Sequence, residues 1–202
     1  MYSLTSLGLD SSKIKLLVVL YSVLFVIIIF VAFALYLLKS VGIYDISRRF
    51  GNKNKWYAFF PFFYDVVLGK TASENKSTTS GTVLLTFNII RTVFFILGFT
   101  MMLSNLVDVA FKADEFLAAG RDVPSEVFDS LVLPAIFILF FFIFSIVYSV
   151  FKYIALYKIY SLLCSSAAIY IILSILVPAT VPFFLFAIRN NRFTKAANID
   201  DF

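Results

Sequence analysis

Arg91 is the one charged side chain in a long apolar stretch, and Asn88 precedes it by three positions. Residues at this spacing share a face of an α-helix, so the two side chains meet the same neighbours. An arginine stays charged at physiological pH and donates hydrogen bonds without accepting any. Its planar guanidinium matches the oxygens of a carboxylate or a phosphate. The chemistry that this pair offers is therefore recognition of an anionic or polar group.

The stretch around Arg91 has the length of a membrane-spanning helix. It covers residues 82–106, which is 25 residues, and about 20 apolar residues cross the ~30 Å hydrocarbon core of a bilayer. At ~1.5 Å per residue, Arg91 lies ~14 Å from Thr82 and so near the middle of the membrane. A charge at that depth needs oxygen atoms from neighbouring segments. We therefore predict that Arg91 faces the interior of a helix bundle.

The last apolar stretch of the chain offers such oxygen atoms. Pro178 and Pro182 lie within it, and a proline removes the donor for the carbonyl four residues earlier, which is Ser174 for the first of them. Ser174 is ~12 Å from the start of this stretch, close to the level predicted for Arg91. We predict a cluster of Arg91, Asn88 and the carbonyl freed at Ser174. Three interpretations are open: a structural clasp, a contact with an acid of another chain, or a binding site for an anionic or polar group.

Composition places the whole chain in the membrane class. Hydrophobic residues make up 61% and charged residues 14%, whereas soluble domains average about 45–50% and about 25%. We predict an all-α integral membrane bundle of four transmembrane helices, forming one domain over residues 1–202. The predicted helices cover residues 14–38, 82–106, 131–157 and 167–188.

A short apolar segment, residues 56–69, lies between the first two predicted helices. It has 14 residues with Pro61 near its middle, so it is too short to cross and cannot form one unbroken helix. Aromatic residues with lysines on either side are typical of the headgroup interface. We predict an interfacial or re-entrant segment. The side chains predicted to contact lipid, here and in the basic turn before it, are Trp56, Tyr57, Arg48, Arg49, Lys53 and Lys55.

Basic and acidic residues are divided between different loops. Residues 40–81 are rich in Lys and Arg, whereas residues 108–129 contain six acidic residues against two basic ones. Cytoplasmic loops carry the excess of positive charge, so the basic loop is predicted to be cytoplasmic, where it attracts anionic lipid headgroups. With four spanning helices both termini are predicted to be external. This topology puts nine basic residues on the cytoplasmic side and seven outside, which is only a small excess inside. A segment 56–69 that crosses the membrane fully, or a hairpin in the last stretch, would move one terminus inside.

Few residue types that carry out catalysis are present. The 202 residues contain no histidine and one cysteine, Cys164, which excludes a disulfide, a Cys/His metal cluster and a His-dependent triad within them. No cofactor, metal site or catalytic residue is predicted. Asp45 and Asp65 are twenty positions apart with basic neighbours, so surface ion pairs are expected rather than an acid–base pair. Because the basic residues are scattered over short loops, nucleic acid is not expected as a partner.

Residues 44–70 combine a helix end, a basic turn and a W-x-A-F-x-P segment that runs into a tyrosine and a Gly-Lys pair. The positions that carry this pattern are Trp56, Ala58, Phe59, Pro61, Tyr64, Gly69 and Lys70. The pattern resembles a loosely defined group of small, uncharacterised bacterial multi-pass membrane proteins. Residues 173–190, with two prolines and a terminal Ile-Arg-Asn, resemble the closing helix of such proteins. The resemblance implies a bacterial cytoplasmic membrane as the location and brings no activity or site residue with it.

Three functions are open from the sequence. The scarcity of catalytic residue types favours a non-enzymatic accessory or assembly subunit of a larger bacterial membrane complex, with other membrane subunits or further copies of this chain as partners. The alternative is a transporter or binding protein for a small solute or a lipid, with its polar site around Arg91. The third is a membrane enzyme that acts on lipid phosphates through Arg91 and the basic loop.

Overall fold

The computed structural model describes residues 11–74, 79–120 and 125–192, and the regular structure in these ranges is entirely helical. Three helices, α1 (Ser11–Arg49), α3 (Thr79–Ala118) and α4 (Val132–Leu163), are long and apolar enough to cross a membrane, as expected of a membrane protein. The shorter elements, with η for a 3-10 helix, are η2 (Lys55–Phe59), α2 (Tyr64–Ala72), η3 (Ser125–Leu131), α5 (Ala167–Leu176), η4 (Pro178–Thr180) and α6 (Val181–Ile188).

The first three predicted membrane helices are present, and each is longer than predicted. Residues 14–38, 82–106 and 131–157 fall within α1, α3 and α4, apart from Leu131 at the start of the third. The helices α1 and α3 have 39 and 40 residues. This corresponds to about 60 Å of helix, twice the ~30 Å hydrocarbon core. Both helices therefore extend well beyond the length that a span requires.

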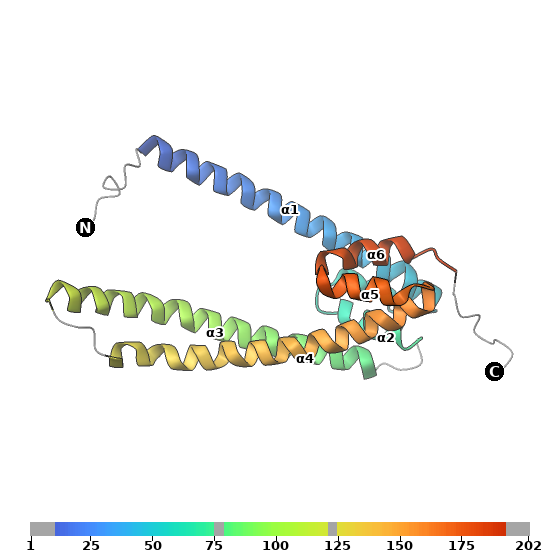
Figure 1. The fold of residues 1–202 in the computed structure, drawn as a ribbon. Helices are drawn as coiled ribbons and strands as arrows, with labels where there is room; N and C mark the ends of the chain where they lie inside the picture. The colour runs from blue at the N-terminus through green and yellow to red at the C-terminus, as the bar shows by residue number, and fades with distance from the viewer. Residues whose placement is uncertain (1–10, 75–78, 121–124, 193–202) are drawn as a thin grey trace.

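The helices α3 and α4 run side by side over most of their length (Figure 1). Phenylalanine rings fill the seam between them. Phe94 packs on Phe140 and on Phe144, with ring centroids 5.4 Å apart in both pairs, and Phe87 stacks on Phe151 at 5.6 Å. Within a bilayer such packing, rather than exclusion of water, holds helices together.

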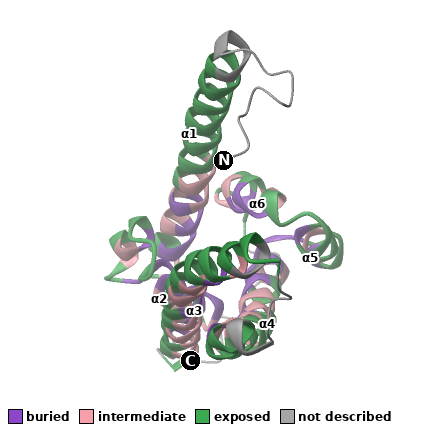
Figure 2. Cartoon of the chain, turned by 90° about the vertical axis from the view of Figure 1, so that its left-hand side faces the viewer, coloured by how far each residue is buried: buried purple, intermediate pink, exposed green. Residues whose placement is uncertain are grey.

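The helix α1 joins this pair at one end only (Figure 1). Its N-terminal half diverges from α3 and α4, and every side chain from Lys15 to Ala34 is exposed (Figure 2). Its C-terminal half, from Ser40, packs against α2 and α6. Gly42 permits a close crossing with α6, because a β-carbon there would lie 2.7 Å from the carbonyl carbon of Leu185.

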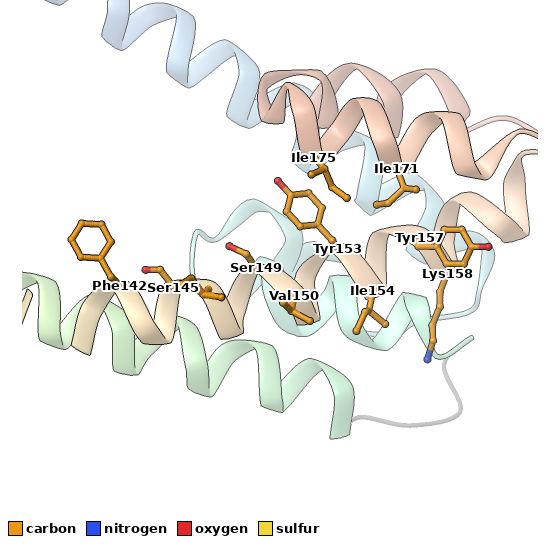
Figure 3. A pocket seen from close by; sticks show the side chains of 11 residues that line it. Phe142, Ser145, Ser149, Val150, Tyr153, Ile154, Tyr157, Lys158, Ile171 and Ile175 are labelled. Atoms are coloured by element: carbon orange, nitrogen blue, oxygen red, sulfur yellow. The ribbon is translucent and has the colours of Figure 1, made fainter. Parts of the chain in front are cut away.

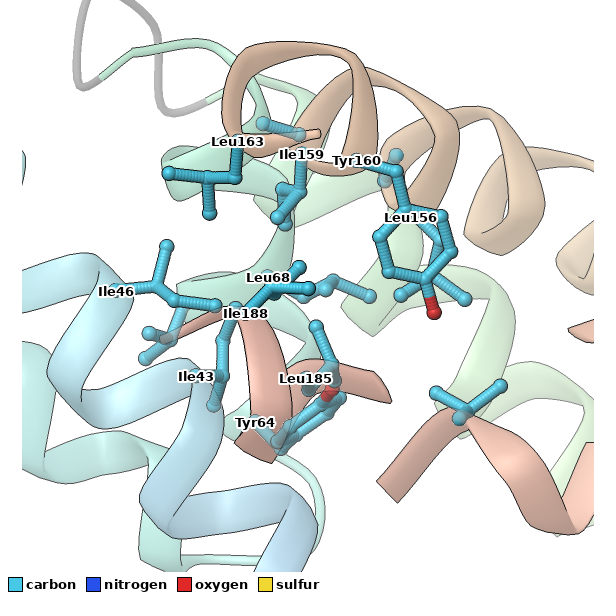
Figure 4. Packing of buried hydrophobic residues seen from close by; sticks show 14 of the residues in the cluster. Ile43, Ile46, Tyr64, Leu68, Leu156, Ile159, Tyr160, Leu163, Leu185 and Ile188 are labelled. Carbon is cyan, nitrogen blue, oxygen red and sulfur yellow. The ribbon is translucent and has the colours of Figure 1, made fainter. Parts of the chain in front are cut away.

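The buried apolar core lies at this end of the molecule (Figure 4). It joins the C-terminal half of α1, the helix α2, the last turns of α4, and α6. Tyr64 of α2, Tyr160 of α4 and Leu185 of α6 are among its largest fully buried side chains. Because α2 contacts α1, α3 and α4, its buried side chains are held in fixed positions.

The prediction of one continuous helix over residues 167–188 is wrong. The chain forms α5, turns through η4 and returns as α6. The side-chain amide of Asn191 donates to the carbonyl of Leu163 at 3.3 Å, so the segment ends beside the point where it left α4. Arg189 closes the hairpin onto α1, because its guanidinium lies 3.6 Å from the carboxylate of Asp45. The described residues thus contain three helices of spanning length and a hairpin of two short ones.

The break in this segment follows from Pro178. A residue that precedes proline is disfavoured in the helical conformation, and Val177 has φ −131° and ψ 86°. Its carbonyl is met locally by Thr180, which donates from its backbone N–H at 2.9 Å and from its hydroxyl at 2.8 Å. The apolar side chains of the turn are exposed, and Leu176 is 72% exposed. The first proline therefore ends a helix instead of kinking it.

Candidate functional site

Close packing of α2 on α3 positions Asp65. The two helices meet at Gly69 and Gly81, where a β-carbon on Gly69 would lie 2.5 Å from the Gly81 backbone. Only glycine allows two backbones to approach so closely. Ser80 adds a hydrogen bond from its hydroxyl to the Gly69 carbonyl at 2.7 Å. Asp65, one turn before Gly69, is 1% exposed and contacts side chains of α3 and α4.

Two side chains donate hydrogen bonds to the Asp65 carboxylate. The amide nitrogen of Asn88, on α3, donates to Oδ2, and the hydroxyl of Tyr148, on α4, donates to Oδ1 at 2.9 Å. Both oxygens therefore accept from a neighbour, as those of an ionised carboxylate do. Asp65 also lies in the first turn of α2, where the helix dipole favours negative charge. These contacts tie α2, α3 and α4 together at one buried point.

Arg91 joins the same cluster through Asn88. Its Nε donates to Asn88 Oδ1 at 3.0 Å, and its guanidinium carbon lies 4.1 Å from the centre of the Tyr148 ring. The negative face of an aromatic ring attracts a cation placed over it. The Asn88 amide therefore bridges the Arg91 cation and the Asp65 carboxylate. Within the described residues the two terminal nitrogens of Arg91 make no hydrogen bond.

Arg91 borders a cavity of about 390 Å³ that four helices line. Lys39 of α1 and Lys152 of α4 line it as well, so three cationic side chains from three helices surround a single carboxylate. With every group ionised, three positive charges and one negative charge leave the lining at +2. The Lys39 ammonium lies 3.6 Å from the centre of the Tyr64 ring. The rest of the lining comprises Pro61, Phe62, Asn88, Thr92, Tyr148 and Ser149.

The cavity lies near the end of the exposed apolar surface of α1 and of α3. On α1 that surface runs from Leu16 to Leu37, about 32 Å of helix, which matches a hydrocarbon core of ~30 Å. Lys39 follows Leu37 by two positions, and Arg91 follows the exposed Ile89 of α3 by two positions. Lys39 and Arg91 therefore lie at the edge of the exposed apolar surface of their helices.

The prediction that Arg91 lies near the middle of the membrane depends on where α3 ends. It takes the helix to end near residue 106, whereas α3 continues to Ala118. The midpoint of α3 is about 11 Å further along the axis than Arg91. The structure does bring Asn88 and Arg91 together, as their shared helix face predicts.

Ser174, Pro178 and Pro182, the other predicted members of the cluster, lie elsewhere. Ser174 is buried in α5, where its hydroxyl donates to the Tyr170 carbonyl at 2.8 Å and lies 3.2 Å from the Tyr160 hydroxyl. Pro178 begins η4 and Pro182 is in α6. The predicted cluster is wrong for these three residues, because the chain breaks at the first proline instead of continuing beside α3.

The segment predicted at the interface, residues 56–69, folds as most of η2, a turn and the first part of α2. Neither helix is long enough to cross a membrane. Trp56, which is 52% exposed, and the four phenylalanines of this segment are exposed, whereas Tyr64 is buried in the core. Of the side chains predicted to contact lipid, Trp56, Arg48, Arg49 and Lys53 are exposed, and Tyr57 and Lys55 are half-buried.

Burial dominates the electrostatics of Asp65. Desolvation raises the pKa of this carboxyl above its ordinary value, although the hydrogen bond from Tyr148, the charge of Lys39 and the hydrogen bond from Asn88 act in the opposite direction. The prediction of a surface ion pair is therefore wrong for Asp65, whereas Asp45 does pair with Arg189.

The sequence does not place four members of the cavity lining beside Arg91: Lys39, Asp65, Tyr148 and Lys152. The two lysines stand close to apolar stretches, where basic residues are common, and Asp65 falls within a basic loop. One signal for Asp65 is present in the sequence. It lies four positions before Gly69 in an otherwise apolar segment, so it shares a helix face with a residue suited to close packing.

No family model, curated protein or solved structure matches this chain. The arrangement itself defines a class of protein: a helical membrane protein with a cationic cavity at the edge of its apolar zone. The residues that line this cavity therefore carry the functional argument.

Proposed function

We propose that this protein binds an anionic group, a phosphate or a carboxylate, in the cavity between α1, α2, α3 and α4. The observation that carries the proposal is the convergence of Lys39, Arg91 and Lys152, from three helices, on a space with one carboxylate. Cations brought together in this way repel one another, and partial burial adds a desolvation cost. An anionic ligand relieves both, because it neutralises the excess positive charge and accepts hydrogen bonds.

The side chains of the cavity have separate parts in this proposal. Arg91 offers its two terminal nitrogens in a plane that matches two oxygens of a phosphate, whereas the lysines act as point charges. Asp65 holds Asn88 and Tyr148 in place by accepting a hydrogen bond from each. Asn88 in turn fixes the Nε of Arg91. The Asp65 carboxylate therefore orients Arg91 through Asn88. The two terminal nitrogens of Arg91 remain available to the ligand.

We further propose that the cavity faces the cytoplasmic leaflet of a bacterial plasma membrane. The hairpin of α5 and α6 puts Arg189 at the same end of the molecule as the basic loop, which strengthens the positive-inside asymmetry. Acidic side chains of α3 lie at the opposite end. With three spans, the chain leaves the membrane on the cytoplasmic side after α6. The bacterial assignment rests on the resemblance of residues 44–70.

Equilibrium binding of anionic probes to the full chain tests the proposal. Protein purified in a neutral detergent is titrated with inorganic phosphate, glycerol 3-phosphate and phosphatidylglycerol, and the Kd of each is measured. Loss of one charge-assisted contact, in Arg91→Gln or Lys152→Gln, is expected to weaken binding about tenfold or more, because such a contact contributes about 1.5–3 kcal/mol.

Lys53→Gln is the matched control, because Lys53 is an exposed lysine outside the cavity. We expect this variant to bind as the wild type does. Failure of the wild-type protein to bind any of the three probes would refute the proposal. Equal binding by Arg91→Gln, Lys152→Gln and Lys53→Gln would refute it as well.

A second candidate function is that of an accessory subunit in a larger membrane complex. It is favoured by α1, whose side chains from Lys15 to Ala34 are all exposed. Extraction in a mild detergent is expected to retain a partner, or a second copy of the chain, in a fixed ratio. Phe30 of α1 is 73% exposed, so its ring is available to a partner. Phe30→Ala is therefore expected to weaken the association. A monomer without a partner under those conditions contradicts this candidate.

A further inference from the structure

An apolar groove adjoins the cationic cavity on α4 (Figure 3). The groove has a volume of about 870 Å³ and lies between α4 and α5. Its α4 side runs from Phe142 to Lys158, and its α5 side is formed by Ile171 and Ile175. The α4 side extends for about 24 Å along the helix axis. Its long axis therefore follows the direction in which the helix crosses the apolar zone.

Ser149 lines both the groove and the cationic cavity. It is therefore the point at which the two spaces meet. From Ser149 to Phe142 the groove continues for about 10 Å along α4, among side chains of the exposed apolar zone. A molecule with its charged end in the cavity can thus extend an apolar part along the groove while staying in contact with α4.

Ser145 gives the groove a polar position below the cavity. Its hydroxyl oxygen is enclosed and makes no hydrogen bond within the described residues. It lies one turn, about 6 Å, from Ser149 on the side away from the cations. An enclosed hydroxyl without a partner is unfavourable, and after rotation about χ1 into the groove it can donate to the carbonyl oxygen of an ester. In a glycerolipid the esters lie between the phosphate and the acyl chains, which corresponds to this level.

We propose that the ligand of the cationic cavity is an anionic glycerolipid with one acyl chain in this groove. The inference rests on the proposed function, which supplies the site for the phosphate. The phosphate lies among Lys39, Arg91 and Lys152, an ester carbonyl accepts from Ser145, and the chain runs toward Phe142. Lipids that merely surround the protein contact every outward apolar face and do not depend on the three cations.

Photo-crosslinking tests where the acyl chain lies. The full chain is placed in nanodiscs of phosphatidylcholine with a small fraction of phosphatidylglycerol that carries a diazirine in its acyl chain. Labelled residues are then located by peptide mass spectrometry. We expect labelling to concentrate on Phe142 and Ile146, with about a tenfold loss in Arg91→Gln. Phosphatidylcholine with the same diazirine is expected to label the outward face, including Ile143, equally in both proteins.

Two variants test the groove without altering the cavity. Ser145→Trp and Ile146→Trp fill it between the cavity and Phe142, whereas Ile143→Trp is a control on the same helix outside the groove. We expect both filling variants to lose phosphatidylglycerol labelling at Phe142. Their binding of glycerol 3-phosphate, which has no acyl chain, is expected to stay within about twofold of the wild type.

The outcomes separate this inference from the proposed function. Labelling by phosphatidylglycerol that is spread as widely as that by phosphatidylcholine overturns the inference, even where glycerol 3-phosphate binds. Glycerol 3-phosphate that binds as tightly as phosphatidylglycerol overturns it too, because the chain then adds nothing. Failure of every anionic probe to bind the wild-type protein overturns both.

Discussion

Replacing Asn88 by leucine removes both hydrogen bonds of its amide while nearly preserving the side-chain volume. Asp65 then loses one of its two donors, and Arg91 Nε loses its acceptor. Asp65 is 1% exposed, so water cannot replace the lost donor, whereas Arg91 is half-buried and can be solvated. A hydrogen bond to a charged group contributes about 1.5–3 kcal/mol. We therefore expect Asn88→Leu to lower the free energy of unfolding by about 2–3 kcal/mol, mostly through the carboxylate.

The assay is reversible unfolding in mixed micelles with a rising fraction of a denaturing detergent, followed by circular dichroism. Asn105→Leu is a control of the same chemical type on the same helix, because the amide of Asn105 donates to a carbonyl at an exposed position. That control is expected to cost about 0.5 kcal/mol or less. In a double-mutant cycle, Asn88→Leu is expected to cost less in the Asp65→Asn background. A loss no larger than that of Asn105→Leu would refute the view that a buried carboxylate organises the cavity.

Three further predictions concern the packing, the charge and the topology of this end of the molecule. Gly69→Ala is expected to destabilise the protein by about 1–3 kcal/mol, because its β-carbon would lie 2.5 Å from the α3 backbone; a Tm equal to that of the wild type would contradict this. Burial raises the pKa of Asp65, so the folded state holds this proton more tightly than the unfolded chain does. Its contribution to the free energy of unfolding therefore falls as the pH rises from about 4 through the raised pKa. Asp65→Asn is expected to remove this fall in the free energy of unfolding above about pH 4. An unchanged slope in the variant would contradict a raised pKa of Asp65. With Cys164 replaced by alanine, single cysteines at Asn190 and Lys53 are expected to react with a membrane-impermeant thiol reagent from the same side. Labelling from opposite sides would mean that the last segment crosses the membrane.

Apolar composition predicts the three long helices but not where they end. A run of apolar residues marks the part of a helix that can lie in lipid, and it gives no signal for its continuation beyond the lipid. The helix α1 continues to Arg49 because Ile43 and Ile46 are buried in the core. The helix α3 likewise continues to Ala118 through a stretch with acidic residues. Both extensions change the depth at which the charged residues lie.

Hydropathy does not determine whether the last apolar stretch forms one helix or a hairpin of two. Residues 167–188 have the length of a span, and a proline in such a stretch can either kink a helix or end it. Here Thr180 satisfies the carbonyl of Val177, and α6 docks on Gly42 of α1. The docking partner lies far away in the sequence, so no local pattern predicts the hairpin.

The cavity was predictable only where its residues share a helix. Asn88 and Arg91 are related by the helical repeat, so a single stretch of sequence pairs them. Asp65 is 23 positions from Asn88 and 83 positions from Tyr148. Those contacts depend on how α2 packs between α3 and α4, and one sequence carries no direct record of that packing.

The central claim is that the cations of the cavity hold an anion. Native mass spectrometry of the protein released from micelles with equal amounts of phosphatidylglycerol and phosphatidylcholine measures it most directly. We expect the wild-type protein and Lys53→Gln to retain phosphatidylglycerol selectively, and the double variant Arg91→Gln/Lys152→Gln to lose this selectivity. Equal retention of the two lipids by the wild-type protein, or selective retention by the double variant, would contradict it.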